Sequence, residues 1–321
     1  MENKVKLGVR FFSFRNQYPY EEALEKIKAM GKDAFDITAS QTVPGYPWPS
    51  DEYIDYFVST YKKHGMQLIS YDGNIDKGIR SDRQLNDDEM FFYALNDITY
   101  AVRFGAKIHR IQWHLPAHVL EKLAPYCEMY QIKAGIEIHS PLRPSSPIMQ
   151  EYIEMLERVK SPWIGLIPDF SSFADKPRPS FLANARKNGI SEEIINYIID
   201  CVYNEVPPAE AEEHLKSLGA GRREFMFMSE AYHSGFGHPD YEGLKRIMPY
   251  VIHVHGKFYT FDENGNDAVI PIEKLLPIIR DSGYDGYITS EYEGHMDGCL
   301  DDPAEMVGKQ LELYTRILEN G

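Results

Sequence analysis

Four acidic or imidazole side chains stand at the ends of four successive apolar segments in the second half of the chain. They are Glu137 in GIEIHSP, Asp169 in GLIPDF, His255 in VIHVHGKFY and Glu291 in GYITSEYEG. Burying a carboxylate without a partner is energetically costly, so two glutamates in apolar segments need a compensating charge. Three carboxylates brought close together also repel one another unless a cation neutralises them. The pattern therefore predicts one divalent metal held by these four side chains.

The predicted donor set, three carboxylates and one imidazole, indicates which metals would bind. Such a set suits Mn²⁺, Mg²⁺ or Co²⁺ with positions open to water or substrate better than a closed structural zinc site. A metal placed this way acts as a Lewis acid on a carbonyl or hydroxyl oxygen. Each residue alone has a structural alternative, since an Asp after a strand is usually a cap or turn residue.

Two further side chains share strand faces with the predicted ligands. His139 follows Glu137 by two residues and lies on its face, nearer the strand end. Its imidazole suits a general base near neutral pH, and the alternative is a histidine packed against a ligand carboxylate. Lys257 follows His255 by two residues. It would bind a substrate hydroxyl or stabilise an oxyanion, or else form a salt bridge with a ligand carboxylate.

Other candidates near strand ends have less defined roles. Trp113 and His114 follow the segment KIHRI, where an indole would stack on a ring of the substrate or belong to the core. His253 is expected to orient a ligand rather than to bind the metal. Asp72 is a candidate substrate contact, and the role of Arg10 is open.

Eight short β-rich segments would position these side chains. They are residues 6–14, 33–38, 67–73, 107–114, 133–139, 163–170, 251–259 and 286–294. Helical patterns such as YEEALEKIKAMG and IEKLLPIIRDSG separate them. Several helices should end at a left-handed glycine, namely Gly31, Gly65 and Gly283. This alternation predicts a parallel α/β sheet, and eight units predict a closed (β/α)8 TIM barrel with the four ligands at its C-terminal mouth.

One connection is much longer than the others. About eighty residues separate Asp169 from Val251, where barrel connections are usually short. We expect one domain over 1–321 with a helical insertion over 171–240, which includes SEEIINYIIDCVYN and PAEAEEHLKSLG. The insertion either decorates the barrel or forms a lid or partner-docking element at the mouth. In the second case Tyr232 and His233 would close over part of the substrate.

Composition limits the classes of partner and location. The formal charge is −15 at pH 7 and no Lys/Arg-rich stripe offsets it, so a small molecule is expected rather than nucleic acid. No run of eighteen apolar residues and no signal-peptide pattern is present, so neither a membrane span nor secretion is predicted. The three cysteines form no CxxC unit, which favours a reducing cytoplasm.

The four predicted ligands, together with IEKLLPIIRDSGYDGYITSEYEG, resemble the xylose isomerase-like superfamily of sugar isomerases and epimerases. Within it, EIHSP, HVHGKFY, IQWHLP and the long insertion are most similar to the alpha (large) subunit of bacterial C-glycoside deglycosidases. The resemblance implies Mn²⁺, a small beta subunit, and a C-glycoside substrate already oxidised to its 3-oxo form by a separate oxidoreductase.

The chemistry that the resemblance implies fits the residues. A ketone at C3 of the sugar acidifies the C2 proton, and its removal gives an enolate that expels the aglycone from C1 in a lyase-type β-elimination. The metal would hold the 3-oxo group, and His139 would be the base. Epimerases of the superfamily are described as using two metal-bound glutamates, here Glu137 and Glu291. A ketose or cyclitol isomerase or epimerase is therefore the alternative.

Two other classes of protein fit less well. A nuclease of the related apurinic-site repair family needs a basic face for DNA, which this acidic chain lacks. A non-catalytic binding barrel would have no need of three carboxylates around a cation.

Overall fold

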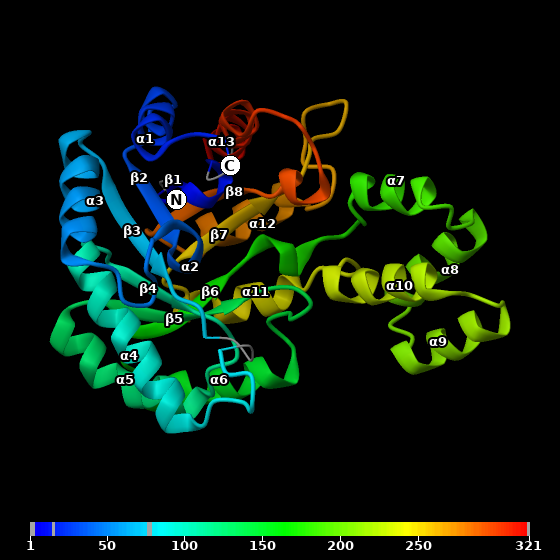
Figure 1. Ribbon diagram of the computed structural model, residues 1–321, viewed down its shortest axis with the longest axis horizontal. Coiled ribbons are helices and arrows are strands. Elements are labelled where there is room, and N and C mark those ends of the chain that lie inside the picture. Colours follow the sequence, from blue (N-terminus) through cyan, green and yellow to red (C-terminus); the bar gives the residue numbers. More distant parts are fainter. Residues whose placement is uncertain (1–3, 15–16, 76–78, 320–321) are drawn as a thin grey trace.

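The computed structural model describes residues 4–14, 17–75 and 79–319, and they form eight parallel strands surrounded by helices (Figure 1). The strands are β1 Lys6–Arg10, β2 Ala34–Thr38, β3 Gln67–Asp72, β4 Ile108–Ile111, β5 Lys133–Ile138, β6 Ile164–Pro168, β7 Val254–Phe258 and β8 Tyr287–Tyr292. They are ordered β6-β5-β4-β3-β2-β1-β8-β7. Strands β6 and β7 meet only through the bridges Leu166↔Val251 and Asp169↔His255, so the barrel is nearly closed. The predicted TIM barrel is confirmed.

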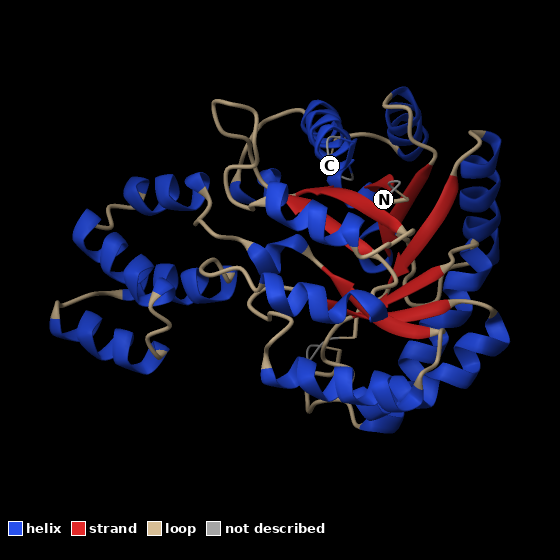
Figure 2. Ribbon diagram, turned by 180° about the vertical axis from the view of Figure 1, so that it is seen from behind, coloured by secondary structure: helices blue, strands red, loops and turns tan. Residues whose placement is uncertain are grey.

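Helices follow the strands and cover the outside of the barrel (Figure 2). They are α1 Tyr20–Ala29, α2 Ala39–Thr42, α3 Asp51–Lys63, α4 Asp87–Phe104, α5 Ala117–Tyr130, α6 Pro147–Val159, α11 Tyr241–Ile247, α12 Ile272–Asp281 and α13 Pro303–Glu319. Local sequence explains their ends. Ser50 caps α3 through the Tyr53 amide, and Asn86 and Glu89 form a capping box on α4. Gly31, Gly65 and Gly283 have φ angles of 72°, 67° and 80°, as predicted.

Several strands are shorter than the apolar runs that predicted them. The run 6–14 forms a strand only to Arg10, and Phe11–Phe14 then turn into a 3-10 helix whose four residues are all buried. The run 251–259 becomes strand only at Val254. An apolar run shows that a segment is buried but does not distinguish a strand from a buried turn.

Apolar side chains fill the barrel below the mouth. Ala34, Ile69, Ile108 and Ile167 form a small interior cluster, and Ile252 and Tyr287 pack against it. A Cβ at Gly135 would lie 2.8 Å from Cδ1 of Ile252 and 2.9 Å from Cγ1 of Ile167, so any larger residue there would displace these side chains. The interior is therefore closed with apolar residues, and the polar residues of the strands gather at the C-terminal ends.

The insertion folds as four helices that pack on one another beside the barrel. They are α7 Pro179–Lys187, α8 Glu192–Tyr203, α9 Pro208–Ser217 and α10 Arg222–Ser234, which we call the helical lobe. It follows the 3-10 turn η2 Phe170–Phe173 and projects away from the barrel (Figure 1). Phe181 stacks on Phe227 at 4.5 Å inside the lobe, and Arg143 reaches Glu205 at 3.0 Å from the barrel side. No helix of the described chain is long and apolar enough to cross a membrane.

Candidate metal and active site

Three of the four predicted metal ligands lie in contact at the barrel mouth. His255 Nδ1 is 2.7 Å from Glu137 Oε1 and 3.8 Å from Asp169 Oδ2. One donor atom from each of the three buried side chains lies within 4.8 Å of the others. The bridge between Asp169 and His255 places the residue that follows β6 beside the second residue of β7. The two ligands are therefore neighbours where the sheet is nearly closed.

Asp169 is both a turn cap and a candidate metal ligand, the two roles that the sequence left open. Its Oδ1 accepts a hydrogen bond from the Ser171 amide at 2.7 Å and caps the turn η2. Its Oδ2 accepts no hydrogen bond from the described residues and faces His255 and Lys257. A structural cap thus fixes the carboxylate with one oxygen directed into the site.

Glu291, the fourth predicted ligand, lies in the same mouth but is held by cations. Its Oε1 is 2.8 Å from Arg10 Nε and 3.8 Å from Lys257 Nζ. Its Oε2 is buried and accepts no hydrogen bond within the described chain. A buried carboxylate oxygen without a donor is costly unless something else balances its charge. Glu291 therefore has a lone-pair position available to a cation.

The ion pairs of the mouth contain more negative than positive charge. Six carboxylates belong to the network, those of Asp36, Asp72, Glu137, Asp169, Glu291 and Glu293. Three permanent cations oppose them, those of Arg10, Arg110 and Lys257. With all six carboxylates ionised, the described network carries an excess of three negative charges. A divalent cation beside Glu137, Asp169 and His255 would offset most of it, so the donor set and the charge both fit the predicted metal.

The arginines and the lysine hold several of these carboxyl groups in their ionised form. Burial raises the pKa of Asp72, but Arg10 and Arg110 hold it at about 2. Burial also acts on Glu137, yet Arg110 at 3.4 Å and the hydrogen bond from His255 keep its pKa well below the ordinary value. Lys257 lowers the pKa of Asp169 against the same burial effect. Metal ligands must be deprotonated, so these groups are in the required state.

His255 and Glu291 respond differently to the same surroundings. Burial and the neighbouring Arg10 lower the pKa of His255, which favours the neutral imidazole that binds metals. Burial raises the pKa of Glu291 well above its ordinary value, although Arg10 and Lys257 act in the opposite direction. The pKa of Lys257 is raised because Asp169, Glu291 and Glu293 outweigh the effect of burial, so its ammonium stays charged.

A cavity of about 190 Å³, the mouth cavity, opens above these residues. It is lined by Arg10, Phe12, Thr38, Gln41, Arg110, Gln112, Trp113, Glu137, His139, Lys257, Glu291 and Glu293. His139 Nδ1 is 2.8 Å from the Ser140 carbonyl oxygen, which can only accept. Nδ1 therefore carries the proton and donates. Nε2 then accepts from the Lys257 ammonium at 2.9 Å, so Lys257 occupies its single lone pair at the edge of the mouth cavity.

The remaining predicted residues fall into three places. Trp113 lines the mouth cavity, and His114 stacks on it with ring centroids 4.1 Å apart. Asp72 is fully buried beneath the cavity, between Arg10 and Arg110. Tyr232 and His233 do not reach it.

Local partners account for the positions of Tyr232 and His233. Both belong to α10 in the helical lobe. The Tyr232 hydroxyl donates to the Val206 carbonyl at 2.8 Å, and His233 Nδ1 contacts the Ser229 carbonyl one helical turn earlier. These local partners hold both side chains within the lobe, so neither lines the mouth cavity.

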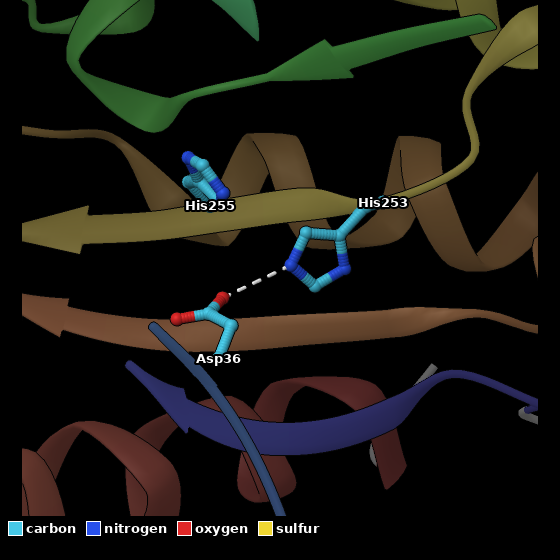
Figure 3. A group of neighbouring side chains, drawn as sticks. All are labelled: Asp36, His253 and His255. Carbon is cyan, nitrogen blue, oxygen red and sulfur yellow. Dashed lines mark hydrogen bonds and ion pairs between the residues drawn. The ribbon is translucent and has the colours of Figure 1, made fainter. Parts of the chain in front are cut away.

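His253 lies behind the ligand group, where an orienting residue was expected. Its Nε2 is 3.1 Å from Asp36 Oδ2 (Figure 3). Thr289 donates to the same carboxylate oxygen at 2.6 Å. Asp36, His253 and His255 also come close enough to form a second candidate metal group. Arg10 Nη1, however, is 3.0 Å from His255 Nε2 and 3.5 Å from Asp36 Oδ1. The guanidinium therefore supplies the positive charge that a second ion would bring.

The sequence patterns did not single out six polar residues that line the mouth cavity or support it. They are Thr38, Gln41, Arg110, Gln112 and Glu293 in the lining, and Asp36 behind it. The signal for Arg110 was present, since Ile108, Arg110 and Gln112 alternate along one face of β4 and its extension. A charge in an apolar strand led to Glu137, and the same rule applied to Arg110 and Asp36 would have found both.

Comparisons with known proteins agree with this architecture. A family model described as "Xylose isomerase-like TIM barrel" matches residues 24–317. A 3'-dehydrocarminate deglycosidase alpha subunit from Microbacterium sp is 32% identical, over 97% of this chain and 95% of the relative. A C-glycoside deglycosidase alpha subunit from Microbacterium trichothecenolyticum is 30% identical, over 97% and 90%. Among solved structures, a xylose isomerase-like TIM barrel protein from Mycobacterium smegmatis in complex with magnesium has a TM-score of 0.58 at 15% identity, covering 100% and 99% of the two chains.

Proposed function

The chain belongs to the xylose isomerase-like TIM barrel family, and we propose from this premise that it is the alpha subunit of a C-glycoside deglycosidase. The proposal rests on two findings. A relative that matches 97% of the chain is named C-glycoside deglycosidase alpha subunit, and another that matches 97% is named 3'-dehydrocarminate deglycosidase alpha subunit. His139, whose Nε2 would take up the proton once Lys257 moves away, lines the mouth cavity together with Glu137.

The proposed reaction is a β-elimination from a 3-oxo-C-glycoside, such as an oxidised flavonoid C-glucoside. The C2 proton moves to His139 Nε2, and the electron pair of the C2–H bond becomes the enolate. As the ketone re-forms, a double bond forms between C1 and C2. The C1–aryl bond breaks, and its electron pair leaves with the aglycone carbon, which takes up a proton. The products are the aglycone and a 1,2-unsaturated 3-oxo sugar.

The predicted metal would supply one element of this chemistry. Held by Glu137, Asp169, His255 and Glu291, a divalent ion such as Mn²⁺ would give Lewis acidity to the 3-oxo group. The orphaned Oε2 of Glu291 and the excess negative charge of the mouth support its presence.

The ion pairs of Lys257 define its role in the proposed reaction. Its ammonium lies 3.3 Å from Asp169 Oδ2 and 3.1 Å from Glu293 Oε1, so it stays charged without His139. It can therefore leave His139 Nε2 when substrate enters and donate a hydrogen bond to a substrate oxygen instead. Developing negative charge on that oxygen would be stabilised by a fixed ammonium in a buried site.

Two further parts of the proposal concern assembly and location. The relatives are named alpha subunits, and we propose a small beta subunit as the partner of this chain. The helical lobe contributes no side chain to the mouth cavity, which favours partner docking over a lid. The single-domain organisation over 1–321 and the cytoplasmic location stay predictions.

A metal-dependent isomerase or epimerase is the second candidate, because the Glu137 and Glu291 carboxylates both line the mouth cavity. The two candidates separate in one assay. The chain, co-expressed with a small partner subunit, is incubated with a 3-oxo-C-glycoside and Mn²⁺, with and without chelator. Chelator-sensitive release of aglycone supports the lyase. Interconversion of free ketoses by the chain alone, with no aglycone released, would replace it with the epimerase.

A further inference from the structure

A second cavity of about 330 Å³ shares Trp113 with the mouth cavity. Its apolar wall is formed by Ile75, Leu85, Met90, Trp113, Pro116 and Ile148. These residues come from the loop after β3, from α4, from the loop after β4 and from α6, so they surround the C-terminal ends of β3 to β5. In Figure 1 the cyan loop after β3 runs beside α6 at the lower part of the barrel.

Trp113 is held firmly between the two cavities. Tyr152, a buried residue of α6, donates its hydroxyl to the Trp113 carbonyl at 2.9 Å. The His114 ring stacks on the indole at an interplanar angle of 27°. A fixed aromatic face is well suited to contact another ring.

The sizes and linings of the two cavities differ in the way that a glycoside would require. The mouth cavity, at about 190 Å³, is smaller than the roughly 300–1,000 Å³ of pockets that bind drug-sized ligands, and charged residues line it. The second cavity lies within that range and is mostly apolar. Gln84 and Glu151 add polar groups to its lining, and both can accept a hydrogen bond from a phenolic hydroxyl.

We propose that the second cavity is the subsite for the aromatic aglycone, with Trp113 at the junction where the sugar–aryl bond lies. The sugar then occupies the mouth cavity beside His139. This inference rests on the proposed function for its substrate. The binding of a free aromatic ligand nevertheless tests the subsite without any turnover.

Filling the second cavity tests the proposal directly. Ile148→Trp places an indole into its wall, and Glu154→Trp puts the same side chain on the exposed face of the same helix. Calorimetric titration of the full chain with the trihydroxyflavone apigenin should show binding by the wild type and by Glu154→Trp. Ile148→Trp should bind at least tenfold more weakly. Equal binding by Ile148→Trp, or no binding by the wild type, would overturn the subsite.

Two controls keep the result independent of folding and of the proposed reaction. Ala117→Phe fills the same cavity from α5 and serves if Ile148→Trp does not fold. The far-UV circular dichroism spectra of the filled variants should match that of the wild type. Loss of apigenin binding in the filled variants, without cleavage of any 3-oxo-glycoside by the wild type, would keep the aromatic subsite and reject the deglycosidase.

Discussion

At the barrel mouth, the side chains of Arg10 and Lys257 are 2% and 3% exposed, and each contacts at least three carboxylates. In the helical lobe, Arg186 and Glu192 form a single pair with side chains 51% and 58% exposed. Both regions contain ion pairs, but only those of the mouth are removed from water. Buried charge is expensive unless it is balanced, whereas exposed pairs are screened by solvent. The mouth is therefore a buried site of paired charges, whereas the ion pair of the lobe is an ordinary solvent-exposed pair.

The largest expected change in stability comes from replacing Arg10, the cation at the centre of the mouth. Arg10→Met leaves Asp36, Asp72 and Glu291 without their shared partner. Breaking a buried ion pair on one side costs about 3–5 kcal/mol, so thermal unfolding should show a large fall in Tm. Arg10→Lys, which keeps the charge, should recover part of it. A Tm unchanged in Arg10→Met would contradict the charge balance described for the mouth.

The second-largest expected change in stability comes from metal binding, and only substitutions in the mouth should abolish it. Because a ligand that binds only the folded state stabilises it, Mn²⁺ at 100 times its Kd should add about 2.7 kcal/mol. Differential scanning calorimetry with Mn²⁺ and with chelator should show this rise in the wild type. Asp169→Asn should lose the rise, while Arg186→Met in the lobe should keep it. An equal rise in Asp169→Asn would show that the metal binds elsewhere.

A carboxyl group buried outside the mouth sharpens the comparison. Asp97 of α4 is fully buried, and its Oδ2 accepts a hydrogen bond from the Tyr46 hydroxyl at 2.8 Å. Burial raises its pKa to about 7, and the hydrogen bond from Tyr46 only partly opposes the shift. Asp97 thus shows what happens to a buried carboxyl group that has no cation bound directly to it, in contrast to Asp72.

The raised pKa of Asp97 predicts a pH dependence of stability. The folded state holds the proton more tightly than the unfolded chain, so this group favours folding at low pH. That contribution is lost as the pH rises through about 7. Between pH 5 and pH 8 the wild type should lose on the order of 2 kcal/mol of unfolding free energy through this group, and Asp97→Asn should not show that loss. Urea unfolding at the two pH values measures it, and an identical pH slope in the variant would refute the assignment.

The smallest change in Tm is expected from a substitution in the helical lobe. Arg186→Met breaks the exposed pair with Glu192. Since solvent screens such pairs, its Tm should equal that of the wild type within measurement error. A fall comparable to that of Arg10→Met would mean that the lobe, too, depends on its ion pairs.

The sequence predicted the part of this molecule that follows from local pattern. Apolar runs located all eight strands, and a carboxylate inside such a run singled out Glu137. The role of Arg10 could not be read in this way. Its partners Asp36, Asp72 and Glu291 come from three other strands, and only the closure of the barrel brings them together.

The insertion shows the other limit. Its helical periodicity predicted helices, but not where their polar side chains would point. Tyr232 looked available to a substrate and instead donates to Val206 in the turn between α8 and α9. The packing of four helices on one another decides such contacts, and no single segment carries that information.

In the proposed reaction, His139 removes the C2 proton of a 3-oxo-C-glycoside at the barrel mouth. The measurement that tests it most directly follows the C2–H signal and the free aglycone by NMR with Mn²⁺ and the partner subunit present. The wild type should lose the signal as aglycone appears. His139→Gln should be slower by about 10²–10⁴-fold, the usual contribution of a general base, and should keep the Mn²⁺-induced rise in Tm. Loss of the C2 proton at the wild-type rate in His139→Gln would contradict the claim and leave Glu137 or Glu291 as the base.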